Sequence, residues 1–184
     1  MSRELIIGVS GGIAAYKTAA LVSSLVQNGH SVSVVMTRAA RKFIGPATFR
    51  ALTNRPVVTD QFDSRFALGA HIELAEKAEL VCVAPASADL LAKAACGLAD
   101  DVLSTLLLSF TGPVLLAPAM NTAMWEKPAV QRSVATLRND GFHFVDPQEG
   151  WQSCRRVGMG RMAEPAEIQA SIERLLSLGD TKGK

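Results

Sequence analysis

The segment 118–125 has the composition that best suits chemistry. It reads PAMNTAMW, with two methionines, a tryptophan and one asparagine. The side-chain amide of Asn121 offers a carbonyl oxygen and an NH2 group in fixed geometry, which suits a substrate carboxylate or the edge of a flavin ring. Met120 and Trp125 are equally well explained as core residues beneath the segment. The segment therefore predicts a binding site in which Asn121 orients a carboxylate or a planar group.

Three further segments combine small or hydroxyl residues with an expected helix start. Residues 10–12 (SGG) and 87–89 (SAD) each precede a helical pattern, and Thr37 follows a valine-rich run. Exposed amide N–H groups and the helix dipole make such a start suitable for phosphate. Each segment alone is also explained by a tight turn or a helix cap. None carries the GxGxxG fingerprint of a pyrophosphate site, and together they point to a phosphorylated cofactor.

The three cysteines differ in their surroundings. Cys82 lies inside an apolar run and is expected in the core, and Cys96 is expected under a helix end. Cys154 lies in a polar, glycine-rich stretch, which is an unusual place for a purely structural cysteine. The odd count and the spacings, which fit no zinc pattern, predict free thiols, no metal site and a reducing cytoplasm.

The segment 118–125 matches the PxMNxxMW motif of the homo-oligomeric flavin-containing cysteine decarboxylases. This family includes phosphopantothenoylcysteine decarboxylases and the enzymes that decarboxylate C-terminal cysteines of lantibiotic precursors. The chain resembles the family up to about Leu178. Four further segments carry the resemblance, in the family's order: 8–17 (GVSGGIAAYK), 71–74 (HIEL), 84–89 (APASAD) and 158–165 (GMGRMAEP).

The resemblance implies FMN as the cofactor and a homotrimer, or a multiple such as a homododecamer, because family members bind FMN between the subunits of a trimer. It implies cofactor contacts from Ser10, Gly11, Gly12, Ile13, Thr37, Arg38, Ala39, Ser87, Ala88, Asp89, Leu90 and Ala119. It implies substrate contacts from Asn121, Met124 and Trp151. His71 would be the catalytic base, although sequence surroundings alone favour a solvated surface group for it, as for His30 and His143.

The reaction that the resemblance implies is decarboxylation of 4'-phosphopantothenoylcysteine to 4'-phosphopantetheine in coenzyme A biosynthesis. Oxidation of the thiol to a thioaldehyde places the carboxylate β to a C=S bond, so that loss of CO2 yields an enethiolate. In the family, a cysteine of the recognition loop then donates a proton, and Cys154 falls at this position. Gly-Asp usually follows that cysteine, whereas Arg155 and Arg156 follow it here. The change alters the loop or adds charge for the substrate phosphate.

Other functions stay open. A lantibiotic-type enzyme would release the enethiol from a peptide C-terminal cysteine, and a relative without catalysis would bind FMN as a regulatory subunit. Retention of His71, Asn121 and Cys154 argues against the regulatory subunit, and the PxMNxxMW match argues against a prenyl-FMN synthase. A plain nucleotide-binding module would carry no yellow colour. Many relatives carry a fused ligase domain, so we expect another protein to supply the ligase step.

The elements that must position these residues alternate between apolar runs and helical patterns. We expect strands at 5–9, 31–36, 80–84, 113–116 and 142–145. We expect helices at 12–28, 38–43, 47–53, 71–78, 87–96, 101–110, 128–139 and 165–178, and a long loop at 146–163. This order predicts an α/β fold with a three-layer, doubly wound, Rossmann-like parallel sheet of flavodoxin-like type. Ligands bind at the carboxyl ends of such strands, where the candidate segments all lie.

Length and composition limit the alternatives. The 184 residues suit one domain, 1–178, with a disordered tail at 179–184. The net charge is only +2, from 19 Lys and Arg against 17 Asp and Glu. Such a small excess gives no electrostatic reason to expect binding to nucleic acid or to an anionic membrane. The sequence contains neither a signal-peptide apolar region nor an apolar run of about 18 residues. A hydrophobic share of 48% fits burial between subunits.

Overall fold

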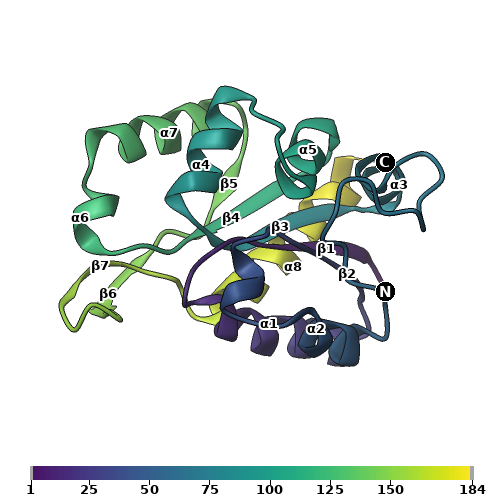
Figure 1. The fold of residues 1–184 in the computed structure, drawn as a ribbon, viewed down its shortest axis with the longest axis horizontal. Coiled ribbons are helices and arrows are strands. Elements are labelled where there is room, and N and C mark those ends of the chain that lie inside the picture. Colours follow the sequence, from purple (N-terminus) through teal and green to yellow (C-terminus); the bar gives the residue numbers. More distant parts are fainter. Residues whose placement is uncertain (1, 183–184) are drawn as a thin grey trace.

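A computed structural model describes residues 2–182, in which five strands form one parallel sheet (Figure 1). Their spatial order is β2 (Ser31–Met36), β1 (Glu4–Val9), β3 (Leu80–Ala86), β4 (Val114–Pro118) and β5 (His143–Phe144). Such an order arises when the chain winds first to one side of β1 and then to the other. It confirms the predicted flavodoxin-like, doubly wound sheet.

Helices cover both faces of this sheet. One face packs against α1 (Ala15–Gln27), α2 (Pro46–Thr53) and α8 (Pro165–Lys182). The other packs against α3 (Ala70–Lys77), α4 (Ala88–Cys96), α5 (Val102–Ser109) and α7 (Pro128–Asn139). Leu5 and Ile7 point into the first core and Ile6 into the second, and all three are at most 1% exposed. Burial on both faces explains why the strands are continuous apolar runs.

Local signals set the ends of the two helices that follow β3. Asp101 caps α5, because its Oδ1 accepts hydrogen bonds from the backbone N–H groups of Leu103 and Ser104, each at 2.9 Å. Gly97 ends α4 with a φ of +67°, a left-handed conformation that glycine adopts without steric cost. The helices therefore begin and end within about one residue of the predicted positions.

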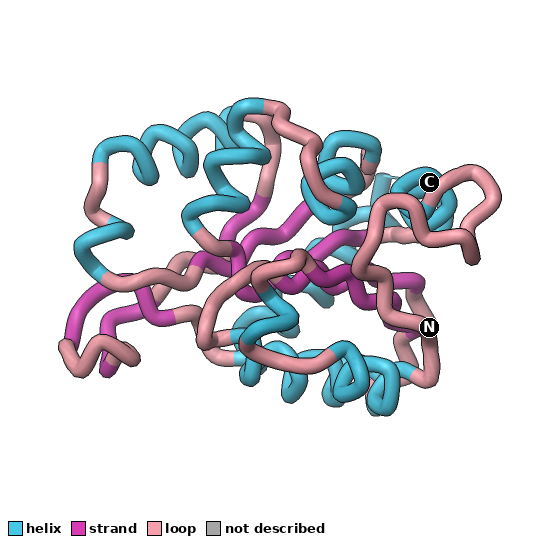
Figure 2. The backbone as a smooth tube through the Cα atoms, in the orientation of Figure 1, coloured by secondary structure: helices cyan, strands magenta, loops and turns pink. Residues whose placement is uncertain are grey.

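The segment 146–163 is not the long loop that we predicted. It contains an antiparallel hairpin of β6 (Gln148–Trp151) and β7 (Val157–Arg161), which projects beyond the carboxyl edge of the main sheet (Figure 2). One face of the hairpin is exposed, whereas the other is partly buried and carries mainly glycine and polar residues, such as Gln148, Gly150 and Gly158. Because the partly buried positions are not apolar, the strands show no alternation of apolar and polar residues, and periodicity does not detect them.

Other boundaries also differ from the prediction: α1 begins at Ala15 and not at residue 12, and β4 ends at Pro118 and not at residue 116. β3 continues through Pro85 to Ala86, because Pro85 lies at the end of the strand, where its carbonyl still accepts a hydrogen bond from Ser10. Helix α8 continues past the predicted tail start at residue 179, because Gly179 does not adopt the positive φ that ends a helix. The tail prediction is therefore wrong for 179–182, and 183–184 lie outside the described residues. In the described part of the chain, no helix has the length and apolar character to cross a bilayer.

Candidate functional site

A cavity of about 440 Å³ lies where the starts of α1 and α4, the short helix α6 (Thr122–Trp125) and the β6–β7 hairpin meet. Its volume is in the range of about 300–1,000 Å³ that small-molecule sites occupy. Ten of the residues predicted from the sequence line it: Gly11, Gly12, Ile13, Ser87, Ala88, Ala119, Asn121, Met124, Trp151 and Cys154. The sheet therefore brings four distant segments together at its carboxyl edge.

The start of α1 forms one wall of this cavity. Among residues 2–182, the backbone N–H groups of residues 11–14 find no hydrogen-bond acceptor. A Cβ atom on Gly11 would lie 2.5 Å from the Cβ atom of Ala39, so only glycine fits this close approach to the segment after β2. Unpaired amides at a helix N-terminus form a binding site for an anion such as phosphate.

Ser10 joins this wall to the start of α4. Its hydroxyl donates to the carbonyl of Pro85 at 2.7 Å and accepts from the backbone N–H of Ser87 at 2.8 Å. The residue is 1% exposed, so its side chain supports the cavity from behind and does not line it. Ser87 in turn accepts from the backbone N–H of Leu90 at 3.3 Å and caps α4. The two helix starts are thus held side by side.

Five other predicted cofactor contacts do not line the cavity. Leu90 is a core residue, and Thr37 accepts a hydrogen bond from the N–H of Ala40 at 3.2 Å to start a 3-10 helix. Arg38 and Ala39 are exposed, although Ala39 borders Gly11. The Asp89 carboxylate is exposed and pairs with the ammonium of Lys93 at 3.5 Å. The segments that contain these residues lie at the predicted edge of the sheet. Which of their side chains point into the cavity depends on how each helix is rotated about its axis, and the position of a residue in the sequence does not determine this.

Asn121 caps α6 and presents its amide to the cavity. The backbone N–H of Met124 donates to Asn121 Oδ1 at 3.0 Å, which assigns the oxygen to the helix side. The NH2 group is therefore the part of the amide that remains to bind a ligand. An NH2 group donates hydrogen bonds, so it suits an acceptor such as a carboxylate.

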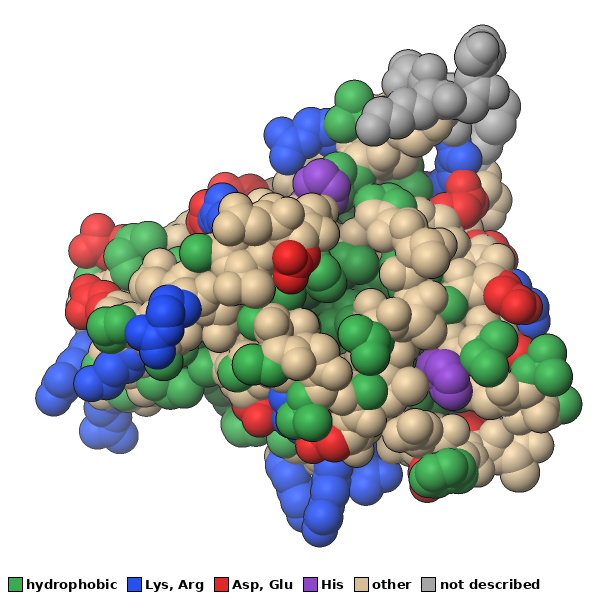
Figure 3. Space-filling model, turned by 90° about the horizontal axis from the view of Figure 1, so that it is seen from above, with side chains coloured by type: hydrophobic (Ala, Val, Ile, Leu, Met, Phe, Trp, Pro, Cys, Tyr) green, Lys and Arg blue, Asp and Glu red, His purple; other side chains and the backbone are tan. Residues whose placement is uncertain are grey.

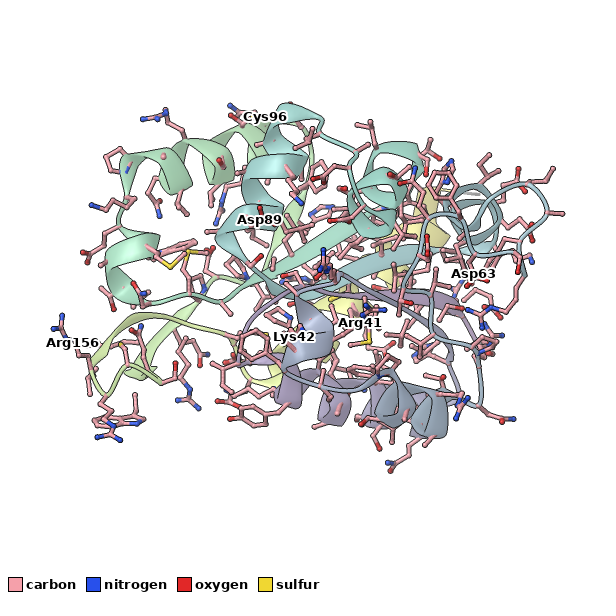
Figure 4. All side chains as sticks on the ribbon, viewed as in Figure 1. Arg41, Lys42, Asp63, Asp89, Cys96 and Arg156 are labelled. Atoms are coloured by element: carbon pink, nitrogen blue, oxygen red, sulfur yellow. The ribbon has the colours of Figure 1, made fainter. Side chains whose placement is uncertain are left out.

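Cys154 is an exposed residue that lines the cavity at the hairpin tip. Its Sγ lies 3.6 Å from Gln152 Oε1, to which the thiol donates. Cys82 differs, because complete burial raises the pKa of its thiol to about 12. Cys96 is exposed at the end of α4, away from the hairpin tip at Arg156 (Figure 4). Of the three thiols, only that of Cys154 faces the cavity.

His71 is the predicted catalytic residue that the single chain does not bring to the cavity. It lies in the first turn of α3, where its carbonyl accepts from Ser109 Oγ at 3.5 Å. Its Nδ1 is buried, and no hydrogen-bond partner for it is found in the described part of the chain. Leu68 and Ile72, which lie close to it in the sequence, have exposed side chains.

Sequence reasoning missed several cavity residues. Lys17 and Arg161 bring two cations to the lining, and both pair with the carboxylate of Glu164. The Lys17 ammonium, 2.9 Å away, holds the pKa of Glu164 below its ordinary value. Gln152 and Met120 complete the contact between the hairpin and α6. Lys17, Met120 and Arg161 all lie inside the segments that carried the resemblance, so those segments contained the missing signal.

Comparison with known proteins decides the family. The sequence profile of the family described as Flavoprotein matches residues 1–177. The chain belongs to this family. It is 46% identical over 174 residues to the coenzyme A biosynthesis bifunctional protein CoaBC of Bacillus subtilis, covering 94% of this chain and 43% of that protein. The CoaBC protein of Mycobacterium bovis is 47% identical over 178 residues, which are 97% of this chain and 42% of that protein. The chain thus spans less than half the length of these relatives.

Solved structures agree with this assignment. The FMN-dependent cysteine decarboxylase SpaF matches with a TM-score of 0.83 and 35% identity, covering 96% of each chain. A PPC decarboxylase mutant complexed with pantothenoylaminoethenethiol matches with a TM-score of 0.87 and 27% identity, covering 96% of this chain and all of that one. These matches confirm the flavodoxin-like fold and the resemblance to flavin-containing cysteine decarboxylases.

Proposed function

We propose that the protein binds FMN and decarboxylates 4'-phosphopantothenoylcysteine to 4'-phosphopantetheine, a step of coenzyme A biosynthesis. The observation that carries this proposal is the cavity, in which two helix starts face the Asn121 amide and the Cys154 thiol. The relatives named CoaBC and the likeness to a PPC decarboxylase support the substrate, and the likeness to SpaF supports the cofactor.

The cavity residues fit FMN. The unpaired amides of residues 11–14 suit its phosphate, and Ile13, Ala119 and Met124 offer apolar surface to its ring. Among the described residues that line the cavity are two cations, Lys17 and Arg161, and no Asp or Glu. A lining of this kind favours an anionic cofactor and an anionic substrate.

The chain's own residues would bind the carboxylate and supply a proton. FMN, held at the amides of residues 11–14 and beside Ile13 and Ala119, would supply the two-electron acceptor for the CH2–SH group and the donor for the saturated product. The NH2 group of Asn121 holds the carboxylate until its C–C bond breaks and the electron pair moves into the C=S bond. The thiol of Cys154 then donates the proton that the saturated product gains on carbon. Because this thiol is exposed, it regains a proton from solvent.

A direct assay tests the proposal. The purified protein with 4'-phosphopantothenoylcysteine should lose the mass of CO2 from the substrate, and its visible absorbance should be that of bound FMN. Release of 4'-phosphopantetheine identifies the coenzyme A reaction. A colourless protein that takes up no FMN, or a substrate that is recovered unchanged, would contradict it.

A second candidate substrate is a peptide with a C-terminal cysteine, which the likeness to SpaF at 35% identity favours. The two candidates differ in product, because the peptide reaction ends at the enethiol. Cys154 in the cavity favours the reaction that continues to the saturated thiol. Its exposed thiol and that of Cys96 also support a reducing compartment, and we place the protein in the cytoplasm.

We further propose that a neighbouring subunit completes the site in a homotrimer or a multiple of it. The support is the position of His71 outside the cavity, near the exposed apolar side chains of Leu68 and Ile72. Apolar side chains reach the surface of the helix layer that contains α5, where one hollow has an apolar floor (Figure 3). An exposed apolar patch of this kind marks a contact surface. His71 of one subunit would then act as base in the cavity of the next.

Subunit mixing tests this arrangement. His71→Asn should retain FMN but lose bleaching of the flavin by substrate. Asn121→Asp should be inactive because its carboxylate repels the carboxylate of the substrate. If one site takes these residues from two subunits, reassembly of the two inactive variants together restores part of the activity. If no activity returns although mixed oligomers form, both residues act within one subunit. Normal bleaching in His71→Asn would remove His71 from the mechanism.

A further inference from the structure

Gln152 is a buried polar residue at the centre of the hairpin tip. It is 8% exposed, while its neighbours Trp151 and Ser153 are exposed. Its Nε2 donates to the carbonyls of Met159 at 2.9 Å and Gly158 at 3.2 Å, so the side chain crosses from one strand of the hairpin to the other. A side chain that crosses a hairpin in this way fixes the shape of the tip.

The same side chain binds the first residue of α6, which follows Asn121. Gln152 Nε2 donates to Thr122 Oγ1 at 3.0 Å, and the backbone N–H of Thr122 donates to Gln152 Oε1 at 3.2 Å. The two segments lie so close that a Cβ atom on Gly158 would overlap the Thr122 hydroxyl. A carboxamide offers a donor and an acceptor on neighbouring atoms, so the Gln152 side chain satisfies both contacts at once.

Gln152 also sets the position of Cys154. Among residues 2–182, Gln152 Oε1 is the hydrogen-bonding partner found for the Cys154 thiol. The backbone of Gln152 closes the turn around it, since its carbonyl accepts from Arg155 N–H and its N–H donates to the Arg156 carbonyl, both at 2.9 Å. Gln152 therefore contacts both the thiol and the helix that Asn121 caps.

We propose that Gln152 is a positioning residue that holds the Cys154 thiol at a set place relative to Asn121, so that decarboxylation is followed by proton donation. The inference rests on the proposed function. Gln152 touches neither the substrate nor the reacting atoms in this role, and it acts through Cys154.

Asn121 has supports that do not involve Gln152. The backbone N–H of Met124 holds its side chain, and the N–H of Ala119 donates to the Ala86 carbonyl at 3.1 Å. Loss of Gln152 should therefore leave the carboxylate site in place while the thiol moves. Thiol oxidation and loss of CO2 should continue, and protonation of the enethiolate should slow.

The matched pair Gln152→Met and Gln148→Met tests this inference. Gln148 lies in the same hairpin, but its side chain donates to the Glu167 carboxylate and not to α6. In Gln152→Met, flavin reduction by 4'-phosphopantothenoylcysteine should stay within about threefold of the parent, while return of the flavin to the oxidised form under nitrogen should slow by about tenfold or more. Mass spectrometry should show a product two hydrogens lighter than 4'-phosphopantetheine. Gln148→Met should make the saturated product at the parental rate.

Hydrogen exchange gives a readout that does not depend on activity. The amide of Thr122 should exchange about tenfold faster in Gln152→Met, because it loses its acceptor, and should be unchanged in Gln148→Met. If Gln152→Met does not retain FMN, Gln152→Ala, which removes the same acceptor oxygen for Thr122 and Cys154, replaces it in the same assays with the same expected results.

The possible failures are distinct. If the parent protein does not convert the substrate, the proposed function fails. If the parent converts it and the variant makes only saturated product, or slows both half-reactions equally, Gln152 has a purely structural role and the inference is overturned.

Discussion

The two walls of the cavity are held in different ways. The wall formed by the starts of α1 and α4 is continuous with the core, because Ser10 is buried and binds both Pro85 and Ser87. The hairpin wall pairs only with itself among the described strands. It reaches the rest of the protein through a few polar contacts: Gln152 with α6, the Gly160 carbonyl with the N–H of Met120 at 2.9 Å, Gln148 with Glu167, and the Glu164 ion pairs. Figure 4 shows Arg156 at its outer tip, away from the sheet.

This difference suggests a division of tasks. A wall that belongs to the core opens only when the domain unfolds, whereas a hairpin held by a few polar contacts opens locally at a lower free energy. The first suits a cofactor that stays bound through many turnovers. The second suits contacts with a substrate that must enter and leave. Substitutions in the two walls should therefore have different consequences.

The largest effect is expected for Asn121→Asp, where the two walls meet. Asp caps a helix as well as Asn does, so α6 and the bound FMN should be retained. A carboxylate in place of the amide would repel the substrate carboxylate, strongly so in a site of low dielectric. We expect turnover to fall by about a hundredfold or more, near 2.7 kcal/mol in the barrier, in steady-state assays. A fall of less than about threefold would mean that Asn121 does not orient that group.

The wall that belongs to the core is tested by two glycine substitutions. A Cβ atom on Gly11 would lie 2.5 Å from the Cβ atom of Ala39, whereas one on Gly12 would lie 3.6 Å from Pro85 Cγ, an ordinary contact. We expect Gly11→Ala to lower the free energy of unfolding by about 1–3 kcal/mol and Gly12→Ala to leave it nearly unchanged. Thermal unfolding of the flavin-free proteins measures both. Equal melting temperatures would show that the Ala39 segment moves aside and that this wall is not rigid.

In the hairpin wall, Cys154→Ser should change the product rather than the fold. A hydroxyl is a much weaker acid than a thiol, so the variant should oxidise and decarboxylate the substrate but protonate the enethiolate slowly. We expect the second half-reaction to slow by about tenfold or more and the enethiol to accumulate, as seen by mass spectrometry. If the variant makes saturated 4'-phosphopantetheine at the parental rate, Cys154 is an ordinary thiol and the coenzyme A reaction loses its proton donor.

The smallest effect is expected for Glu164→Gln, at the base of the hairpin. The Lys17 hydrogen bond lowers the pKa of Glu164, so this pair stabilises the fold above the ordinary pKa of a glutamate and less as pH falls through the lowered value. Because Glu164 is 43% exposed, we expect about 0.2–1 kcal/mol at neutral pH. The difference in melting temperature between parent and variant should be smaller at pH 4 than at pH 7. A difference that is constant with pH would exclude the ion pair as its cause.

The sequence by itself determined the sheet and the identity of the site's segments. Buried parallel strands are continuous apolar runs, and Gly97 and Asp101 mark helix ends by local chemistry, so these features are visible without a structure. Local motifs such as PAMN placed Asn121 at a strand end, where a doubly wound sheet binds its ligands.

Only the tertiary structure decided which side chains face the cavity. Ser10 points inward because it binds Pro85, a residue 75 positions away in the sequence. Leu90 enters the core because of the way α4 is rotated against the sheet. The sequence also did not predict the hairpin, because its strands show no alternation of apolar and polar residues. It did not predict the role of Gln152, because that role depends on the hydrogen-bond partners that the fold brings to its side chain. His71 shows the same limit, since its surroundings in the folded chain, not its motif, place it outside the cavity.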